Sequence, residues 1–314
     1  MKEEKASATS IERKEKMKCV IKAPAKINLF LEVVGKRADG YHNIFSLMHT
    51  IPLCDTVSAE RLYPENGERK IFFTCSDPSL PIDNQNLAYK AAEHFFERFS
   101  DSPYAMRLHI DKVIPKEAGL GGGSADAAAV LMCCARLYPE QIRTGSDKLY
   151  QTAVSLGADV PFCLMRGAAA AYGIGEILKP TSVLPDCFIV IAKGPQAVST
   201  AAAYRTLDDI PKSAIRSDDL SEMIACLKNQ NLDGICTYLY NRFEEAVFPD
   251  CPTALSTKLL MLEYGAKGAL MSGSGSAVFG LFESACFAES AVEALRKMAG
   301  ISVWTLFSGD IKYC

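Results

Sequence analysis

A chain of 314 residues that is 49% hydrophobic and 23% charged has the composition of a soluble globular protein with about two domains. Its net charge of −3 provides no general attraction for nucleic acid or for an anionic membrane. No apolar stretch reaches the roughly 18–20 residues that span a bilayer, and the 12 cysteines occur without a C-x-x-C pair, which favours reduced thiols. We therefore expect a cytoplasmic protein that binds neither nucleic acid nor membrane.

The N-terminal part of the chain divides into a polar extension and a strand-rich segment. Residues 1–17 carry charges of both signs and no apolar core, so we expect a disordered extension rather than a targeting signal. Apolar residues alternate over 19–34, which predicts a strand, a break at Pro24 and a second strand, followed by a polar turn over 35–42. Further along, strands are predicted over 71–75 and 107–113, with a helix over 86–99 between them.

The middle and C-terminal parts mix helices and strands without regular alternation. A helix is predicted over 124–137 with Ser124 as its N-cap, and a segment rich in Gly, Pro, Thr and Ser over 173–185 predicts a domain boundary. The other predicted helices cover 146–156, 199–207, 219–228, 253–264 and 289–298. The other predicted strands cover 168–172, 187–192, 269–271, 277–282 and 302–307. This order is typical of an α+β fold with two layers rather than of a doubly wound sheet.

Residues 114–129, IPKEAGLGGGSADAAA, are the most informative part of the sequence. Glycine allows positive φ and has no Cβ to obstruct a ligand. A glycine loop that leads into a helix presents free N–H groups, at the positive end of the helix dipole, to an anion. A P-loop would need a lysine before Ser124, and a dinucleotide loop would need the G-x-G-x-x-G spacing. The pattern therefore predicts a phosphate-binding loop of another type, with a flexible linker before the helix as the alternative.

The glycine loop resembles the central motif of the GHMP kinases, the family of galactokinase and of the homoserine, mevalonate and phosphomevalonate kinases. Residues 23–29, APAKINL, resemble the first motif of this family, and residues 272–276, SGSGS, resemble its third. The resemblance extends from about residue 18 to the C-terminus. It implies a two-domain GHMP kinase fold, with an N-terminal ATP-binding domain like ribosomal protein S5 over 18–180 and a C-terminal ferredoxin-like α/β domain over 181–314.

Longer segments resemble one branch of the family, whose substrate is 4-diphosphocytidyl-2-C-methyl-D-erythritol. They are PAKINLFLEVVGKRADGYH at 24–42, AGLGGGSADAA at 118–128, LGADVPF at 156–162 and SGSGSAVF at 272–279. This resemblance implies that ATP phosphorylates the 2-hydroxyl of that compound, in the non-mevalonate route to isoprenoid precursors. Phosphoryl transfer requires a protein mainly to position groups and to stabilise charge.

The resemblance also assigns roles to particular residues. Asp159 would accept the proton of the acceptor hydroxyl, with Lys26 as its cationic partner. Without the resemblance, the two would be an ordinary loop carboxylate and a surface lysine. Asn28 would orient the hydroxyls of the substrate, and Tyr41 and His42 would bind its cytosine. The predicted substrate contacts are completed by Tyr204, which would stack on the base, and by Gly273 and Gly275 near the diphosphate.

The predicted ATP site combines contacts near adenine with a loop around the triphosphate, formed by Asn86, Leu87, Pro115, Gly119, Leu120, Gly121, Gly122, Gly123 and Ser124. Mg²⁺ is expected because ATP arrives as its complex, and the candidate ligands are Ser124 and Asp126. A GHMP kinase for another acceptor, such as mevalonate, and a non-catalytic ATP sensor remain alternatives. The GYH turn at 40–42 argues against the first, and the presence of both Lys26 and Asp159 argues against the second. We expect a monomer or a weak homodimer.

Overall fold

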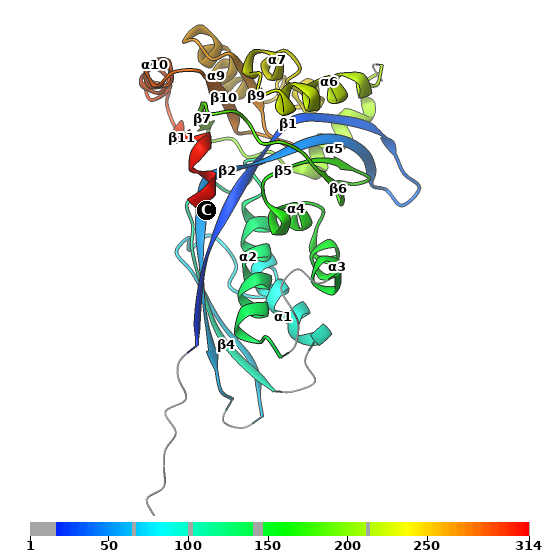
Figure 1. Cartoon of the computed structure of the whole chain (residues 1–314), viewed down its shortest axis with the longest axis vertical. Helices are drawn as coiled ribbons and strands as arrows, with labels where there is room; N and C mark the ends of the chain where they lie inside the picture. The colour runs from blue at the N-terminus through cyan, green and yellow to red at the C-terminus, as the bar shows by residue number, and fades with distance from the viewer. Residues whose placement is uncertain (1–16, 65–66, 100–102, 141–146, 212–213, 314) are drawn as a thin grey trace, which may run out of the picture.

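The computed structural model describes residues 17–64, 67–99, 103–140, 147–211 and 214–313. These residues form two β-sheets in one elongated molecule (Figure 1). The larger sheet has seven strands, in the order β3-β4-β2-β1-β8, with β5 paired to β2 and β6 paired to β5. The smaller sheet has four strands in the order β11-β7-β10-β9. The predicted α+β architecture is therefore confirmed, whereas the predicted extension over 1–17 lies outside the described residues except for Met17.

The larger sheet is built around a long antiparallel pair, β1 (Lys18–Lys36) and β2 (His42–Leu62). A register shift between Pro24 and Lys26 interrupts their pairing. The predicted break at Pro24 is therefore wrong, because the shift accommodates a residue without an N–H inside one continuous strand. β2 has no counterpart among the predicted elements, since polar residues interrupt its apolar alternation, as in SLMHTIPLCDT at 46–56.

Shorter strands complete the larger sheet: β3 (Arg69–Cys75), β4 (Tyr104–Asp111), β5 (Ala168–Tyr172), β6 (Ile177–Pro180) and β8 (Tyr240–Asn241). The three strands predicted in this part of the chain are confirmed, with shifted ends for β3 and β4. β6 lies in the segment predicted as the domain boundary and pairs with β5. β8 comes from the C-terminal half of the chain and pairs with β1 in parallel. The boundary between 180 and 181 stays a prediction.

Four helices lie on one side of the larger sheet (Figure 1): α1 (Leu87–Phe99), α2 (Gly122–Leu137), α3 (Asp147–Leu156) and α4 (Val160–Met165). α1, α2 and α4 contact its strands, whereas α3 packs on the other three helices. α2 is buried along most of its length, and its small alanine and cysteine side chains allow the sheet, α1 and α4 to approach closely. The N-cap predicted at Ser124 is wrong, because the helix begins at Gly122 and its N-cap is Gly121 in the left-handed conformation. Glycine adopts that conformation without a Cβ clash, so the helix starts two residues earlier.

The smaller sheet consists of β7 (Phe188–Lys193), β9 (Gly268–Met271), β10 (Val278–Phe282) and β11 (Ser302–Phe307). β7 is buried on both faces: Ile189 and Ile191 join the core shared with the larger sheet, whereas Val190 and Ala192 join a second core. This explains why the strand is apolar at every position from 188 to 192.

The remaining helices belong to the C-terminal half of the chain, and α9 and α10 pack on the smaller sheet. They are α5 (Thr200–Asp209), α6 (Ser217–Lys228), α7 (Leu232–Thr237), α8 (Phe243–Val247), α9 (Pro252–Glu263), α10 (Ala285–Leu295) and the 3-10 helix η1 (Ser308–Tyr313). The helices predicted in this half of the chain correspond to α5, α6, α9 and α10. The short helices α7 and α8, like α4 in the N-terminal half, were not predicted.

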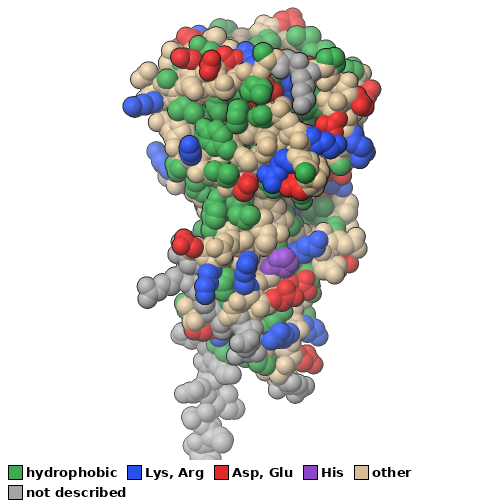
Figure 2. Space-filling view, turned by 90° about the vertical axis from the view of Figure 1, so that its right-hand side faces the viewer, with side chains coloured by type: hydrophobic (Ala, Val, Ile, Leu, Met, Phe, Trp, Pro, Cys, Tyr) green, Lys and Arg blue, Asp and Glu red, His purple; other side chains and the backbone are tan. Residues whose placement is uncertain are grey.

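The surface mixes charges of both signs, in agreement with the small net charge. On the face shown in Figure 2, Lys and Arg side chains lie among Asp and Glu side chains. Among the described residues, no helix combines the length and the apolar character needed to cross a bilayer. Cys133, Cys134 and Cys163 are buried, as expected for cysteines that pack as small hydrophobic residues.

Candidate active site

The predicted site residues come from separate segments of the chain, and the structure places all of them around one cavity of about 1100 Å³. They are Lys26, Asn28, Tyr41, His42, Asn86, Leu87, Pro115, Gly119, Leu120, Gly121, Gly122, Gly123, Ser124, Asp126, Asp159, Tyr204, Gly273 and Gly275. A cavity of this size is large enough for drug-sized ligands. The roles of the individual residues stay predictions.

The glycine loop packs directly on the turn at 272–276. A Cβ on Gly119 would lie 1.9 Å from the backbone oxygen of Ser272, and the φ of Gly119 is +73°. The Ser272 hydroxyl donates to the Gly119 carbonyl at 2.9 Å, and the Ala277 N–H donates to the Ala118 carbonyl at 3.1 Å. The contact between two protein loops therefore requires glycine at 119, as does the backbone conformation.

Lys26 lies in a space that two further glycines leave open. A Cβ on Gly121 would lie 2.9 Å from Lys26 Cγ, and a Cβ on Gly273 would lie 3.3 Å from Lys26 Nζ. By contrast, a Cβ on Gly123 would meet nothing within 4 Å. Within the loop, the missing side chains of Gly119 and Gly121 thus serve the packing of the protein itself, whereas the space beside Gly123 is open to a ligand.

The first turn of α2 provides hydrogen-bond donors to the cavity. Its N-cap, Gly121, has no side chain with which to bond these donors. The first N–H groups of a helix have no partner within the helix, and here they belong to Gly122, Gly123 and Ser124, which line the cavity. The helix dipole adds about 0.3–1 kcal/mol for an anion. This end of the cavity is therefore suited to phosphate.

Lys26, Asn28 and Asp159 form a connected polar group. Lys26 Nζ donates to Asn28 Oδ1 at 2.7 Å and lies 3.4 Å from Asp159 Oδ2. Asn28 Nδ2 donates to the Ser46 hydroxyl, which donates to the Phe30 carbonyl, so the amide oxygen of Asn28 is fixed toward Lys26. The Lys26 side chain is 6% exposed and that of Asp159 is 29% exposed. The carboxylate is therefore the member of the pair that a ligand can reach.

Two stacked aromatic rings line another part of the cavity. The centroids of His42 and Tyr204 lie 4.5 Å apart, with the ring planes inclined by 18°. Tyr204 also contacts Phe243 edge-on, at 4.8 Å and 84°. Burial, and secondly the carboxylate of Asp159, raise the pKa of Tyr204 to about 12, so its hydroxyl is neutral. Because His42 already covers one face of Tyr204, only the other face could stack on a base, and that role stays a prediction. Tyr41, by contrast, is 61% exposed, and no ring of the described residues is stacked on it in this way.

Asp208 on α5 is a site residue that was not predicted. Its Oδ1 lies 2.7 Å from His42 Nε2, and its Oδ2 lies 2.7 Å from Lys36 Nζ. Hydrogen bonds from Lys36 and, secondly, from His42 hold the pKa of Asp208 below its usual value. The only sequence signal is that Asp208 follows Tyr204 by four residues, which places both side chains on one face of a helix.

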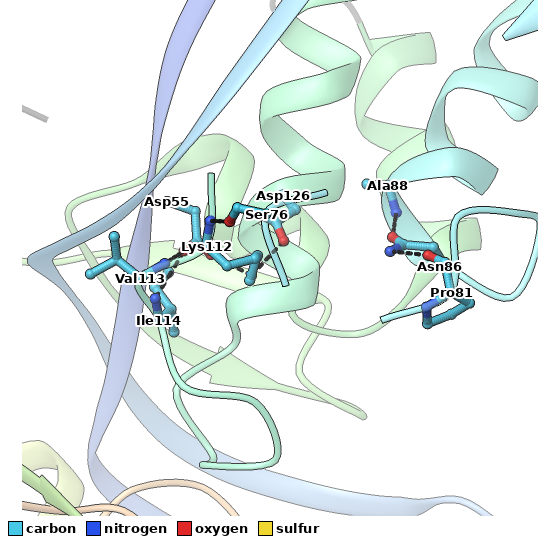
Figure 3. A network of polar contacts seen from close by, with 9 residues as sticks. All are labelled: Asp55, Ser76, Pro81, Asn86, Ala88, Lys112, Val113, Ile114 and Asp126. Atoms are coloured by element: carbon cyan, nitrogen blue, oxygen red, sulfur yellow. Dashed lines mark hydrogen bonds and ion pairs between the residues drawn. The ribbon is translucent and has the colours of Figure 1, made fainter. Parts of the chain in front are cut away.

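A buried charge cluster beside the start of α2 was also not predicted (Figure 3). Lys112 makes ion pairs with Asp55 and, at 2.6 Å, with Asp126. Asp55 also accepts hydrogen bonds from the two backbone N–H groups that follow Lys112. Burial raises the pKa of Asp126 to about 7, although the charge of Lys112 acts in the opposite direction. A Cβ on Gly122 would lie 3.5 Å from Lys112 Nζ, so the cluster supports the end of the glycine loop.

Asn86, predicted near adenine, caps α1 (Figure 3). Its Oδ1 accepts a hydrogen bond from the Ala88 N–H, and its Nδ2 donates to the Pro81 carbonyl, both at 3.0 Å. These protein contacts fix the amide of Asn86. Asn86 and Leu87 nevertheless line the cavity together with Pro115, as the predicted nucleotide contacts require.

The fit of the predicted Mg²⁺ ligands differs between the two candidates. The described residues contain no group of three or more His, Cys, Asp or Glu side chains that could hold a metal ion. Asp126 is buried and paired with Lys112, with only Oδ1 left without a hydrogen-bond partner. Ser124 lines the cavity at the first turn of α2. Because Mg²⁺ keeps several waters and binds through phosphates with few protein ligands, Ser124 fits such an ion and Asp126 fits it poorly.

Comparison with known proteins matches two segments of the chain to two family models. The model described as the GHMP kinases N terminal domain matches residues 86–167, and the GHMP kinases C terminal model matches residues 214–300. The 4-diphosphocytidyl-2-C-methyl-D-erythritol kinase of Exiguobacterium sibiricum is 39% identical over 280 residues, which cover 89% of this chain and 94% of that protein. The protein of the same name from Geobacillus thermodenitrificans is 40% identical over 267 residues, covering 85% and 89% of the two chains.

Solved structures show the same relationship. A crystal structure of 4-(cytidine 5'-diphospho)-2C-methyl-D-erythritol kinase has a TM-score of 0.74 and 34% identity, covering 92% of this chain and 98% of that one. Homoserine kinase from Cytophaga hutchinsonii has a TM-score of 0.73 over 94% and 95% of the two chains, but its 19% identity supports a common fold alone. The chain therefore belongs to the family of 4-diphosphocytidyl-2-C-methyl-D-erythritol kinases, a branch of the GHMP kinases.

Proposed function

We propose that this chain transfers the γ-phosphoryl group of ATP to the 2-hydroxyl of 4-diphosphocytidyl-2-C-methyl-D-erythritol, giving the 2-phosphate and ADP in the non-mevalonate route to isoprenoid precursors. The observation that carries the proposal is the Lys26–Asp159 pair, 3.4 Å apart, in the same cavity as the glycine loop. A kinase needs its acceptor and its phosphate site within one such space. The names of the relatives indicate the acceptor.

Asp159 accepts the proton of the 2-hydroxyl while the hydroxyl oxygen attacks the γ-phosphorus. Its carboxylate is within reach of the cavity, whereas Lys26 is buried beside it. Lys26, held by Asn28, provides a fixed positive charge where negative charge develops between the acceptor oxygen and the phosphoryl group. The bond between the γ-phosphorus and the oxygen of ADP breaks, and Asp159 retains the proton until the product leaves. General-base catalysis of this kind contributes roughly 10²–10⁴-fold.

The glycine loop and the first turn of α2 bind the phosphates of ATP through backbone N–H groups, with the open side of Gly123 toward the nucleotide. Mg²⁺, when bound, supplies positive charge to the phosphate oxygens, and the Ser124 hydroxyl is its protein ligand in this proposal. Gly273 and Gly275 lie beside the diphosphate of the acceptor. Asn241 fixes this turn by donating to the carbonyls of Met271 and Gly273 at 2.7 and 2.8 Å.

Tyr41 and His42 bind the cytosine of the acceptor. His42 is held against Tyr204 and hydrogen-bonded to Asp208, so it presents a fixed polar edge. Tyr41 lies in the turn between β1 and β2 and is mostly exposed, so its ring is available to pack on a base.

The acceptor is tested by measuring ADP release from MgATP with 4-diphosphocytidyl-2-C-methyl-D-erythritol, mevalonate or homoserine. We expect turnover with the cytidyl compound alone. Turnover with mevalonate or homoserine but not with the cytidyl compound would overturn the proposal. ATP binding without turnover of any acceptor would indicate a sensor.

Asp159→Asn tests the catalytic step, because it keeps the shape of the side chain and removes the base. We expect kcat to fall by at least roughly 10²-fold, and to the background rate if no other group can accept the proton. ATP affinity and the thermal unfolding midpoint should be retained. A kcat within a few-fold of the unmodified enzyme would exclude Asp159 as the base.

A further inference from the structure

We propose that Asp208, acting through His42, is the positioning residue that makes the site select cytosine over uracil in the base of its substrate. This inference rests on the proposed function, and it concerns a residue that no sequence motif indicates. Asp208 forms no bond to the substrate in this proposal. It determines which nitrogen of the His42 ring carries the proton, and so which base can bind there.

Lys36, His42 and Asp208 meet where the ends of β1 and β2 lie beside α5. Lys36 is the last residue of β1 and His42 is the first of β2, and the two are paired directly across the turn. Asp208 lies on α5, one helical turn after Tyr204. One carboxylate can therefore bond both partners, with 2.7 Å from Oδ1 to His42 Nε2 and 2.7 Å from Oδ2 to Lys36 Nζ.

These contacts determine the tautomer of His42. A carboxylate only accepts hydrogen bonds, so His42 Nε2 must carry the hydrogen that it shares with Asp208. In the neutral ring, Nδ1 is then left with a lone pair. The ring cannot easily turn away from this arrangement, because it is stacked on Tyr204 and 8% exposed. His42 therefore offers an acceptor, Nδ1, to a ligand in the cavity that it lines.

The two pyrimidines differ in what they present to such an acceptor. Cytosine carries an amino group at position 4, which donates, whereas uracil carries a carbonyl oxygen there, which accepts. An acceptor on the protein bonds the amino group and repels the carbonyl oxygen. A fixed Nδ1 lone pair thus favours cytosine, with an expected preference of roughly 10- to 100-fold.

Lys36 makes the substitution Asp208→Asn informative. The ammonium of Lys36 has only donors, so it would bond the amide oxygen of Asn. The amide NH₂ would then face His42 Nε2, which would have to accept, and the proton of the ring would move to Nδ1. The variant would present a donor to the base in place of an acceptor. We therefore expect the preference for cytosine to be lost or reversed, rather than both bases to be weakened equally.

The experiment compares kcat/KM for the cytidine and uridine diphosphate esters of methylerythritol. In Asp208→Asn we expect the cytidine-to-uridine ratio to fall at least tenfold, mainly through KM, with kcat at saturating cytidine ester within a few-fold. Asp209→Asn is the matched control, since it makes the same change at the next position of α5, where the side chain is exposed and does not line the cavity. It should leave the ratio unchanged.

A second readout does not depend on activity. Nitrogen-15 chemical shifts of the histidine rings distinguish the two tautomers, and only four histidines need to be assigned. We expect a hydrogen on Nε2 of His42 in the unmodified protein and on Nδ1 in Asp208→Asn. An unchanged base ratio in Asp208→Asn, or an Nδ1-protonated ring in the unmodified protein, would overturn this inference and leave the proposed function intact. An enzyme that turns over neither ester would overturn the proposed function, and this inference with it.

Discussion

The cavity has a phosphate end, at the glycine loop 119–123, and a base end, at His42, Tyr204 and Asp208. The two ends are built in different ways. At the phosphate end, glycines let two loops and Lys26 pack so closely that a single Cβ would collide with protein atoms. At the base end, side chains of β1, β2 and α5 meet through hydrogen bonds and ring contacts, and several are partly exposed. The first region combines binding with the stability of the fold. The second can change its specificity with little effect on the fold.

The largest expected effect concerns the buried charges beside the glycine loop. Lys112→Met leaves Asp55 and Asp126 buried without their cation, and breaking a buried ion pair costs about 3–5 kcal/mol. The loss should appear in the free energy of unfolding measured with urea. Lys116→Met is the control, because Lys116 is exposed. A loss below about 1 kcal/mol for Lys112→Met would show that the phosphate end does not depend on this cluster.

Two glycines of the same loop should respond differently to alanine. At Gly119 the new Cβ would lie 1.9 Å from the Ser272 oxygen and φ is +73°, so we expect a loss of roughly 2–4 kcal/mol from overpacking and backbone strain. At Gly123, in open space within α2, alanine should stabilise by up to about 1 kcal/mol and weaken ATP binding. Equal changes in stability for the two variants would contradict the distinction between packing and ligand-facing glycines.

At the base end, Tyr204→Leu should affect affinity for the acceptor more than affinity for ATP. The variant removes the aromatic contacts with His42 and Phe243, each worth about 0.5–1.5 kcal/mol. We expect KM for the cytidyl substrate to rise about three- to tenfold, with kcat and KM for ATP nearly unchanged. Tyr264→Leu, a partly exposed tyrosine outside the cavity, should change none of these constants. A rise in KM for ATP as large as that for the acceptor would contradict the separation of the two ends.

The same difference explains how much of the site could be predicted from sequence. The phosphate end is encoded locally: four glycines within five positions and an alanine-rich helix indicate an anion loop without knowledge of the fold. Even there, position 119 must be glycine because a Cβ would collide with the backbone oxygen of Ser272, more than 150 residues away in the sequence. Its role in packing could not be inferred from the loop itself.

The residues that were missed depend on distant partners. Asp208 and Lys112 lie in no recognisable motif, and each acquires its role from side chains on other elements. β2 was missed for a related reason, since its polar residues are stabilised by neighbours rather than by solvent: Asp55 by Lys112, and His49 by the N–H of Leu184. Periodicity identifies strands whose polar residues face water, and β2 does not follow that rule.

The most direct test of the central claim is to identify the product that the unmodified enzyme forms from MgATP and 4-diphosphocytidyl-2-C-methyl-D-erythritol. Phosphorus-31 NMR would show the number and position of the phosphate groups. A single cavity with ATP at the glycine loop and the acceptor beside Asp159 predicts one new phosphomonoester on the 2-oxygen, an intact cytidine diphosphate group and one ADP per product. Phosphate on another hydroxyl, or ADP formed with inorganic phosphate alone, would contradict it.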